Sequence, residues 1–358
     1  MKPVYVIAEA GVNHNGILAF ARELVDRAAD AGANAVKFQT FDAKKLASRS
    51  LAKAKYQTQT TEAEESQFDM LHKLELPREW HHELRDRAHA RGIEFLSTAF
   101  DPDSLDFLES LSMPFYKVPS GELTNGPLLW KFARQRRPLV VSTGMATLSE
   151  VELALAVIAH GFNADAEPAH VDEVWQGWSR AEWRDSLHDR VTLLHCTSQY
   201  PTPMHEVNLK AMDTLARAFN LPVGYSDHTS GILIPVVAVA RGAVLIEKHF
   251  TLNRTMPGPD HQASLEPEEL ARMIRDIRTI EVAFGDGAKS PQASEWDTRK
   301  AARQQVVATR DIRQGECFTR ADLSTARSGR GLPPTALWGF VGQPALRDYA
   351  AAEPLDPQ

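Results

Sequence analysis

Two apolar, strand-like runs in the sequence each end abruptly in charged and polar residues. One run is followed by Ser226-Asp-His228 and the other by Glu247-Lys-His249. Burial of such groups at strand ends costs several kcal/mol unless they meet partners, a metal ion or a ligand. Because both runs end in a histidine near a carboxylate, His228 and His249 favour a divalent-cation site that stays partly open for a substrate. The alternative is that both histidines are satisfied core residues.

Lysine and serine residues at other predicted strand ends indicate that the same site binds an anion. Lys37 and Lys117 each follow a short apolar run, and glycine-containing turns accompany them. Ammonium groups, hydroxyls and closely approaching backbone N–H groups suit a phosphate. The sequence therefore predicts phosphate-centred chemistry, with hydroxyl groups supplied by Ser120, Ser142 and Ser226.

Three carboxylates are candidates for acid–base work in this site. Glu9, Glu122 and Asp260 could each move a proton or accept hydrogen bonds from sugar hydroxyls. Their alternative role is to cap a helix or to form a salt bridge.

The elements that would bring these residues together alternate along the chain. Eight strand-like runs are separated by segments with helical periodicity, without a long antiparallel hairpin. This order predicts an α/β fold, a (β/α)8 TIM barrel, in which the carboxyl ends of all strands face one pocket. An open doubly wound sheet is the alternative, but no glycine-rich dinucleotide turn follows the first strand. The predicted strands are 4–10, 35–39, 93–98, 115–119, 139–142, 192–196, 222–226 and 244–248.

Two excursions and a change of composition complete the predicted organisation. Residues 41–76 leave the carboxyl-end face of the barrel, so we expect them to wall or cover the pocket. Residues 162–190, which hold three of the seven tryptophans, lie on the opposite face and predict helical padding or a subunit contact. The predicted domains are a catalytic barrel over 1–284, a linker over 285–303 and a small unit over 304–358.

Composition narrows the class of protein. The net charge is −7 and the sequence has no cluster of Lys and Arg, so it offers no basic patch that would bind nucleic acid. No apolar run approaches the roughly 18 residues of a membrane span, and the amino terminus lacks a signal-peptide pattern. Cys196 and Cys317 have neither disulfide nor zinc spacing. We therefore expect a cytoplasmic protein that binds small molecules, with no nucleic-acid or membrane partner.

Short motifs occur in one order along most of the chain. They are AEAGVNHNG at 8–16, VKFQT at 36–40, YKVPSGE at 116–122, STGM at 142–145, LHCTSQYPTP at 194–203, GYSDHT at 224–229, EKHF at 247–250 and PGPD at 257–260. Together they closely resemble the N-acetylneuraminate synthase family of nonulosonic (sialic-type) acid synthases. The carboxyl-terminal unit, with ATRDIRQGE at 308–316, looks like the family's antifreeze-like (SAF) domain, of the β-clip type.

The resemblance implies an N-acetylneuraminate synthase, a transferase. Such an enzyme joins phosphoenolpyruvate to the open-chain aldehyde of N-acetylmannosamine. Water adds at C2, and cleavage of the C–O bond releases phosphate. Within the family, a 2,4-diacetamido-2,4,6-trideoxyhexose that yields a legionaminic- or pseudaminic-type acid is the close alternative substrate.

The resemblance also assigns roles by motif position. It implies that His228 and His249 hold Mn²⁺, with Mg²⁺ as an alternative, which acts as a Lewis acid. It implies catalytic roles for Glu9, Glu122 and Lys117. Residues implied to bind phosphoenolpyruvate are Lys37, Thr98, Lys117, Ser120, Ser142 and Ser226, and those implied to contact the sugar are Gln39, Tyr200, Asp260 and Arg327.

The family's quaternary structure adds one expectation. The resemblance implies a domain-swapped homodimer, in which an arginine of the antifreeze-like domain, here Arg327, reaches into the partner's pocket. The family commonly has Arg-Pro-Gly at this point, and this chain has Arg327-Ser328-Gly329. The proline that would fix a backbone angle after the arginine is therefore absent.

Two different classes of protein are the alternatives to a synthase. One is a barrel aldolase that uses Lys37 or Lys117 as a Schiff-base nucleophile. The other is a non-catalytic saccharide-binding protein in which the small carboxyl-terminal unit recognises the saccharide. The Lys, Ser, His and Glu residues at the predicted strand ends favour the synthase.

Overall fold

The computed structural model describes residues 2–46, 48, 53 and 66–356, and the chain divides into two compact units, Met1–Phe284 and Gly285–Gln358. All eight predicted strands are present in the first unit. They are β1 (Tyr5–Gly11), β2 (Ala35–Thr40), β3 (Glu94–Ala99), β4 (Tyr116–Val118), β5 (Leu139–Ser142), β6 (Val191–His195), β7 (Val223–Asp227) and β8 (Leu245–His249).

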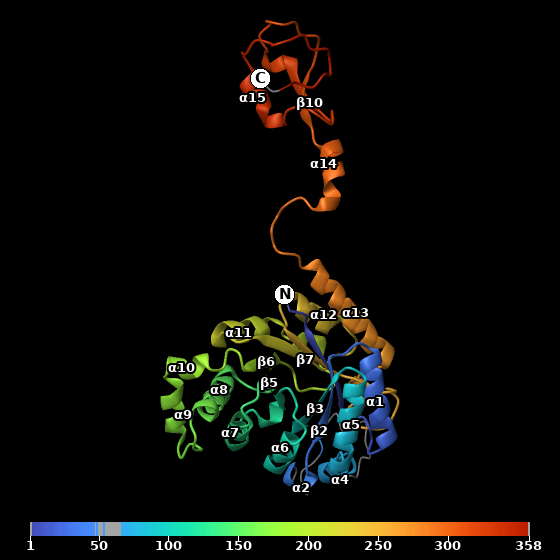
Figure 1. The fold of residues 1–358 in the computed structure, drawn as a ribbon, viewed down its shortest axis with the longest axis vertical. Coiled ribbons are helices and arrows are strands. Elements are labelled where there is room, and N and C mark those ends of the chain that lie inside the picture. The colour runs from blue at the N-terminus through green and yellow to red at the C-terminus, as the bar shows by residue number, and fades with distance from the viewer. Residues whose placement is uncertain (1, 47, 49–52, 54–65, 357–358) are drawn as a thin grey trace. The chain divides into compact units, whose positions relative to one another are not determined.

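The strands of the first unit form a nearly closed parallel barrel. Their order is β3-β2-β1-β8-β7-β6-β5-β4, and the two end strands, β3 and β4, lie side by side. Helices surround the strands on the outside (Figure 1). The predicted (β/α)8 barrel is therefore confirmed. In this order β1 lies between β2 and β8, which places Glu9 in register with Lys37 on one side and His249 on the other.

The barrel helices are amphipathic, and their apolar faces cover the strands. In α1 (Leu18–Asp30), for example, Ala21, Leu24, Val25 and Ala28 recur at helical spacing and are all buried. The other helices of this unit are α2 (Ala43–Leu46), α4 (Gln67–Lys73), α5 (Arg78–Ala90), α6 (Pro102–Glu109), α7 (Gly126–Arg134), α8 (Leu148–Asn163), α9 (Val171–Trp178), α10 (Ala181–Asp185), α11 (Lys210–Phe219), α12 (Leu233–Ala240) and α13 (Pro267–Ala283).

The second unit has a small core of its own. Its two strands, β9 (Gln305–Ala308) and β10 (Leu323–Ala326), pair antiparallel, and α15 (Leu337–Phe340) packs near them. The helix α14 (Trp296–Ala302) forms inside the segment that the sequence predicts as a linker. The core of this unit comprises Val306, Ala308, Ile312, Phe318, Leu323, Leu337, Phe340, Ala345, Tyr349 and Leu355.

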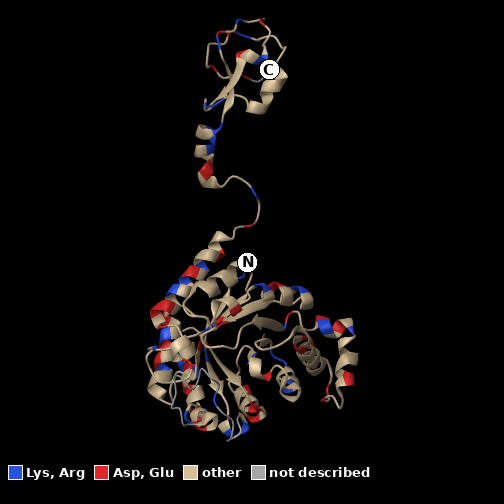
Figure 2. Cartoon of the chain, turned by 180° about the vertical axis from the view of Figure 1, so that it is seen from behind, with Lys and Arg blue, Asp and Glu red and all other residues tan. Residues whose placement is uncertain are grey.

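Charges of both signs are interspersed on the outside of the barrel (Figure 2). Arg87 of α5 and Arg91, which directly follows this helix, both bind Asp26 of α1. Such exposed pairs contribute little stability individually. Within the described ranges, none of the helices is both long and apolar enough to cross a membrane.

A buried histidine gives the barrel a predictable response to acid. His81 of α5 is fully buried; its Nδ1–H donates to the Pro77 carbonyl (3.0 Å), and its Nε2 lies 2.7 Å from the Thr40 hydroxyl. Burial lowers the pKa of His81 from 6.5 to about 4, and burial also lowers the pKa values of His14 and His261 to about 4. Between pH 6.5 and 4 these histidines are protonated in the unfolded chain but not in the folded one. The free energy of unfolding therefore falls as the pH drops from 6.5 to 4.

Replacing this histidine should flatten the pH dependence of stability. We expect His81→Gln to reduce the slope of unfolding free energy against pH by up to about 1.4 kcal/mol per pH unit inside this window. Urea unfolding at about pH 4.5, 5.5 and 6.5 measures it, with the exposed neighbour His82→Gln as the control. Equal slopes for His81→Gln and the unchanged protein would contradict the prediction.

Candidate active site

A cavity of about 460 Å³ opens at the carboxyl ends of the barrel strands. Each of the eight strands, or the loop that follows it, contributes to the lining, as expected for a TIM barrel. Most of the residues predicted from the sequence meet here. They are Glu9, Lys37, Gln39, Thr98, Lys117, Ser120, Ser142, Tyr200, Ser226, His228, His249 and Asp260.

The alternation of side chains along β8 explains how the chain builds this lining. Successive residues of a strand point to opposite faces, so Glu247 and His249 both line the cavity while Lys248 between them points away. The Lys248 ammonium donates to the Asp227 carboxylate of β7 at 2.5 Å, and both side chains are fully buried. Asp227 also accepts hydrogen bonds from the backbone N–H and hydroxyl of Thr229. This buried network ties the ends of β7 and β8 together.

Lys37 is a buried cation between two carboxylates. Its Nζ lies 2.7 Å from Glu9 Oε2 and 3.5 Å from Glu247 Oε2, and it donates to the Thr98 hydroxyl at 2.9 Å. Burial opposes its charge, but the attraction of Glu247 and Glu9 outweighs burial and raises the pKa of Lys37. The lysine is therefore charged when the cavity holds no substrate.

Lys117 is the second cation, and it is held less tightly. Its Nζ lies 3.6 Å from Glu247 Oε1 and donates to the Val118 carbonyl at 3.3 Å. Burial lowers the pKa of Lys117, and this effect exceeds the opposing attraction of Glu247. An anionic ligand beside Lys117 would favour its charged form and raise its pKa again.

Glu9 and Glu247, two of the buried carboxylates of the cavity, differ in proton affinity. Burial raises the pKa of Glu9 to about 7, with Lys37 lowering it and the charge of Glu247 raising it. Burial also acts to raise the pKa of Glu247, but Lys117 and Lys37 reverse this and bring it to about 2. Neighbouring carboxylates whose pKa values are pushed apart are suited to different roles, one as a proton carrier and one as a fixed negative charge.

Two neutral imidazoles lie beside these charges. The rings of His228 and His249 are 5.5 Å apart, and Tyr200 packs 4.1 Å from His228 and 5.6 Å from His249. His228 donates from Nδ1 to the Thr197 carbonyl at 2.7 Å, which leaves its Nε2 lone pair for another ligand. Burial lowers the pKa values of both histidines. Neutral imidazole is the form that binds metal ions.

The histidine pair fits an open metal site better than a closed one. His249 Nδ1 is buried without a hydrogen bond in the described part of the chain, and Asp260 Oδ2 lies 3.8 Å from it. Among the described residues, no three or more His, Cys, Asp and Glu side chains gather closely enough to hold a metal ion by themselves. A cation held by the two histidines would complete its coordination with water or substrate oxygens, as in catalytic sites.

Close backbone packing orients one of the hydroxyls. The N–H of Gly144 donates to the Ser120 hydroxyl at 3.0 Å. A Cβ at Gly144 would lie 2.4 Å from the Ser198 hydroxyl and 2.8 Å from that of Ser120. The loop after β5 therefore packs closely on the loops after β4 and β6, and a side chain at Gly144 would displace the Ser198 and Ser120 hydroxyls.

Comparison with known families follows the same division of the chain. The model of the NeuB family matches residues 24–289, and that of the SAF domain matches residues 303–358. The chain belongs to the NeuB family. Its carboxyl-terminal unit is an SAF domain, as predicted. Because its relatives are nonulosonic acid synthases, which are phosphoenolpyruvate-dependent transferases, the protein is such an enzyme, and the saccharide-binding alternative is excluded.

Relatives of this NeuB-family chain match it over nearly its whole length. The N,N′-diacetyllegionaminic acid synthase of Campylobacter jejuni is 45% identical over 353 residues, 99% of this chain and 99% of that one. The synthase of the same name from Legionella pneumophila is 43% identical, over 98% of this chain and 93% of that one. Human N-acetylneuraminate-9-phosphate synthase is 32% identical, over 96% of this chain and 89% of that one.

Solved structures support the same assignment. The N-acetylneuraminic acid synthetase of Leptospira borgpetersenii, solved in complex with citrate, superimposes with a TM-score of 0.67 at 32% sequence identity. The match covers 84% of this chain and 93% of that chain.

One residue predicted to be catalytic lies elsewhere in this NeuB-family barrel. Glu122 ends the short 3₁₀ turn Ser120–Glu122 that follows β4. Its carboxylate accepts a hydrogen bond from the Asn125 amide at 2.7 Å, and it is not part of the cavity lining. The sequence correctly placed Glu122 just after the end of β4. The turn that follows this strand, however, directs Ser120 to the cavity and Glu122 toward the start of α7.

Arg327 belongs to the second unit, where it follows β10 and is exposed. The next residue, Ser328, donates from its backbone N–H and from its hydroxyl to Gln305 Oε1, at 2.9 and 3.0 Å. The first of these hydrogen bonds restrains the backbone at the position where the family commonly has proline. A proline could not donate the first of them.

Glu247 is the functional candidate that the sequence-based assignment omitted. It binds both lysines and accepts a hydrogen bond from the Ser226 hydroxyl at 2.8 Å. Strand periodicity is the signal that could have found it, because Glu247 precedes His249 by two residues and must share its face.

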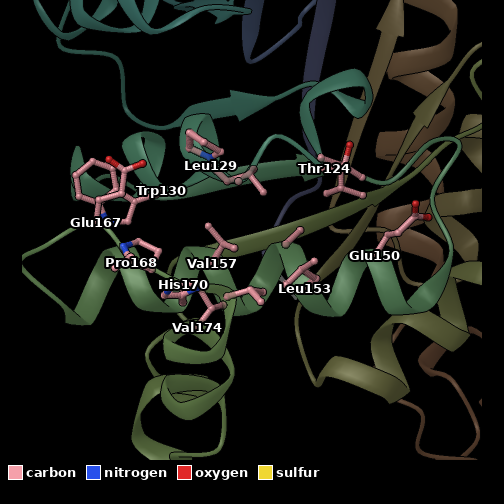
Figure 3. A pocket seen from close by; sticks show the side chains of 16 residues that line it. Thr124, Leu129, Trp130, Glu150, Leu153, Val157, Glu167, Pro168, His170 and Val174 are labelled. Atoms are coloured by element: carbon pink, nitrogen blue, oxygen red, sulfur yellow. The ribbon is translucent and has the colours of Figure 1, made fainter.

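A second, smaller cavity lies away from the strand ends. It has a volume of about 280 Å³ and is bordered by α7, α8 and α9 (Figure 3). Leu129 and Trp130 of α7, Leu153 and Val157 of α8 and Val174 of α9 give it a largely apolar lining. The helices α9 and α10 of the tryptophan-rich excursion pack against α8, as expected for helical padding, one of the two roles predicted for this segment.

Proposed function

We propose that this chain is an N,N′-diacetyllegionaminic acid synthase. It condenses phosphoenolpyruvate with the open-chain aldehyde of a 2,4-diacetamido-2,4,6-trideoxyhexose and releases phosphate. The observation that carries the choice of sugar is the 45% identity to the Campylobacter jejuni enzyme of that name over 99% of both chains. The sequence-based prediction placed N-acetylmannosamine first and this sugar second; the lower identity to the human N-acetylneuraminate-9-phosphate synthase, 32%, supports the second.

The buried cations support binding of phosphoenolpyruvate in this cavity. Its phosphate and carboxylate groups carry several negative charges, which Lys37 and Lys117 offset through charge-assisted hydrogen bonds. Ligand oxygens would replace part of the contact that Glu247 makes with the two lysines. The hydroxyls that would complete the binding site are those of Thr98, Ser120, Ser142 and Ser226.

The paired carboxylates support the proton transfers of the reaction. C3 of phosphoenolpyruvate forms a bond to the aldehyde carbon, the aldehyde oxygen gains a proton, and water adds at C2 and loses one. The C2–O bond to phosphate then breaks. Glu9, with a pKa of about 7, suits the proton taken from water. Glu247, with a pKa of about 2, keeps its negative charge and stabilises positive charge that develops at C2.

The remaining roles concern the sugar. His228 and His249 would hold a divalent cation, Mn²⁺ with Mg²⁺ as the alternative, which when bound polarises the aldehyde oxygen. Gln39, Tyr200 and Asp260 line the cavity and would bind hydroxyl or acetamido groups. The reach of Arg327 into a partner's cavity, and with it the domain-swapped homodimer, stays a prediction, as does the cytoplasmic location.

The direct test measures phosphate released from phosphoenolpyruvate with Mn²⁺ present. We expect kcat/KM for a 2,4-diacetamido-2,4,6-trideoxyhexose to exceed that for N-acetylmannosamine by at least about tenfold, because pocket contacts to single groups discriminate by about this factor or more. A preference for N-acetylmannosamine would make the enzyme an N-acetylneuraminate synthase instead. Phosphate release with neither sugar would contradict the proposal.

A further inference from the structure

One side of the active-site cavity is apolar, in contrast to the charged residues at the strand ends. The helix α4 and the residue after it contribute Met70, Leu71 and Leu74 to the lining. Phe100, which follows β3, and Val12, which follows β1, also line the cavity. We call Met70, Leu71 and Leu74 the α4 wall. It belongs to the predicted pocket-walling excursion 41–76, of which residues 47, 49–52 and 54–65 lie outside the described residues.

The α4 wall is held by a small apolar cluster of its own. Met70 and Leu74 are buried against Val12 and Phe41, and Leu71 is partly buried against the same cluster. The Ser66 hydroxyl caps α4 by accepting a hydrogen bond from the Asp69 backbone N–H at 3.1 Å. The side chains that line the cavity are therefore fixed from behind, and Leu71 is the member whose surface is least covered.

A glycine fixes the position of the end of this helix. Gly16, in the loop after β1, has a φ of +69°, and a Cβ there would lie only 2.8 Å from the Lys73 carbonyl oxygen. The last turn of α4 therefore packs directly on the backbone of the first loop. Such contact defines how far the α4 wall projects into the cavity.

An apolar wall distinguishes between the carbons of a sugar. A hydroxyl placed against it exchanges its hydrogen bonds to water for none, which is unfavourable, whereas a methyl group is stabilised there. The aldehyde carbon must meet phosphoenolpyruvate near the lysines, so the far end of the open chain is the part free to reach the wall. N-acetylmannosamine has a hydroxyl on C6, and a 2,4-diacetamido-2,4,6-trideoxyhexose has a methyl group.

We infer that the α4 wall recognises the C6 methyl group of a 6-deoxy sugar, an inference that rests on the proposed function. Gln67, one helical turn before Leu71, is the polar residue that α4 adds to the lining, and its amide suits an acetamido group. Discrimination at C6 therefore comes from Leu71 and its neighbours, and it is separable from recognition of the second acetamido group at C4.

The test compares two sugars that differ only at C6. These are N-acetylmannosamine and its 6-deoxy analogue, and kcat/KM for each is measured by phosphate release. If turnover of either sugar is too slow to measure, its inhibition constant as a competitor of the diacetamido sugar is measured in place of kcat/KM. We expect the unchanged enzyme to prefer the 6-deoxy analogue by about 10- to 100-fold. Leu71→Gln should bring this ratio close to one, with KM for phosphoenolpyruvate unchanged.

Two further variants control the experiment. Leu71→Ala removes methyl contacts without adding a polar group and should lower the same ratio by about tenfold, which keeps the test valid if the glutamine variant does not fold. His72→Gln, on the exposed side of α4, should keep the ratio of the unchanged enzyme.

The outcomes separate this inference from the proposed function. An unchanged enzyme that prefers N-acetylmannosamine to the diacetamido sugar would overturn the proposed function. A preference for the diacetamido sugar, with a C6 ratio near one or a ratio that Leu71→Gln does not change, would leave that function standing and overturn the α4 wall as its source.

Discussion

Replacing Lys117 with methionine is expected to lower kcat/KM for phosphoenolpyruvate by about 10²- to 10³-fold, as for removal of one preorganised donor to a developing or bound anion. Methionine keeps an unbranched side chain that is one heavy atom shorter, and it removes the charge. Lys37 still pairs with Glu247 and Glu9, so the barrel should fold without Lys117. The loss should appear mainly as a raised KM for phosphoenolpyruvate if Lys117 contributes equally to substrate and transition state.

A surface lysine supplies the matched control. Lys131 of α7 binds Asp106 and the Pro102 carbonyl outside the cavity, and Lys131→Met makes the same change in net charge. It should leave KM for phosphoenolpyruvate within about twofold of the unchanged enzyme, because exposed ion pairs have small effects. A loss of less than about fivefold in Lys117→Met, measured by steady-state phosphate release, would remove this lysine from the proposed binding site.

Replacing His249 with alanine is expected to lower turnover by about 10³-fold or more, because the divalent cation that we propose it holds would contribute several kcal/mol of charge stabilisation. His249 has few other bonds to lose, since its Nδ1 makes no hydrogen bond in the described part of the chain. The fold should therefore be retained. Titration calorimetry with Mn²⁺ gives a second readout, in which we expect the unchanged protein to bind Mn²⁺ and the variant to lose that binding.

His205 provides the comparison for this change. It lies in the exposed turn Met204–Glu206, outside the cavity, and His205→Ala removes an imidazole from the surface. We expect normal Mn²⁺ binding and activity from it. Mn²⁺ affinity in His249→Ala equal to that of the unchanged protein would show that His249 is not a ligand, whatever the activity.

Much of the barrel and of its cavity could be predicted because strand ends are visible in a sequence. Each of four apolar runs predicted a strand, and the polar residue at its end predicted a side chain that lines the cavity. These residues are Lys37, Lys117, Ser142 and His249. The rule that parallel strands of a barrel open into one pocket then brought together residues far apart in the sequence.

The rest depended on geometry that residue types do not carry. Glu122 and Ser120 are two residues apart in one turn, and only the backbone of that turn decides which of them faces the cavity. Glu247 has charged neighbours in the sequence, so its residue type alone did not single it out. Its importance comes from its position between two lysines of other strands. The α4 wall was expected only as a covering segment, since its contacts with Val12 and Phe41 are long-range.

The apolar cluster behind α4 is separate from the main core of the barrel. Substitutions in it therefore need not weaken the packing that keeps the eight strands together, and they act on the substrate with little penalty elsewhere. Such a separation lets a lineage of enzymes change its sugar while the chemistry at the strand ends stays constant. For the same reason, an engineer who wants a different nonulosonic acid from this barrel should begin with libraries at Met70, Leu71 and Leu74 and leave the lysines and histidines unchanged.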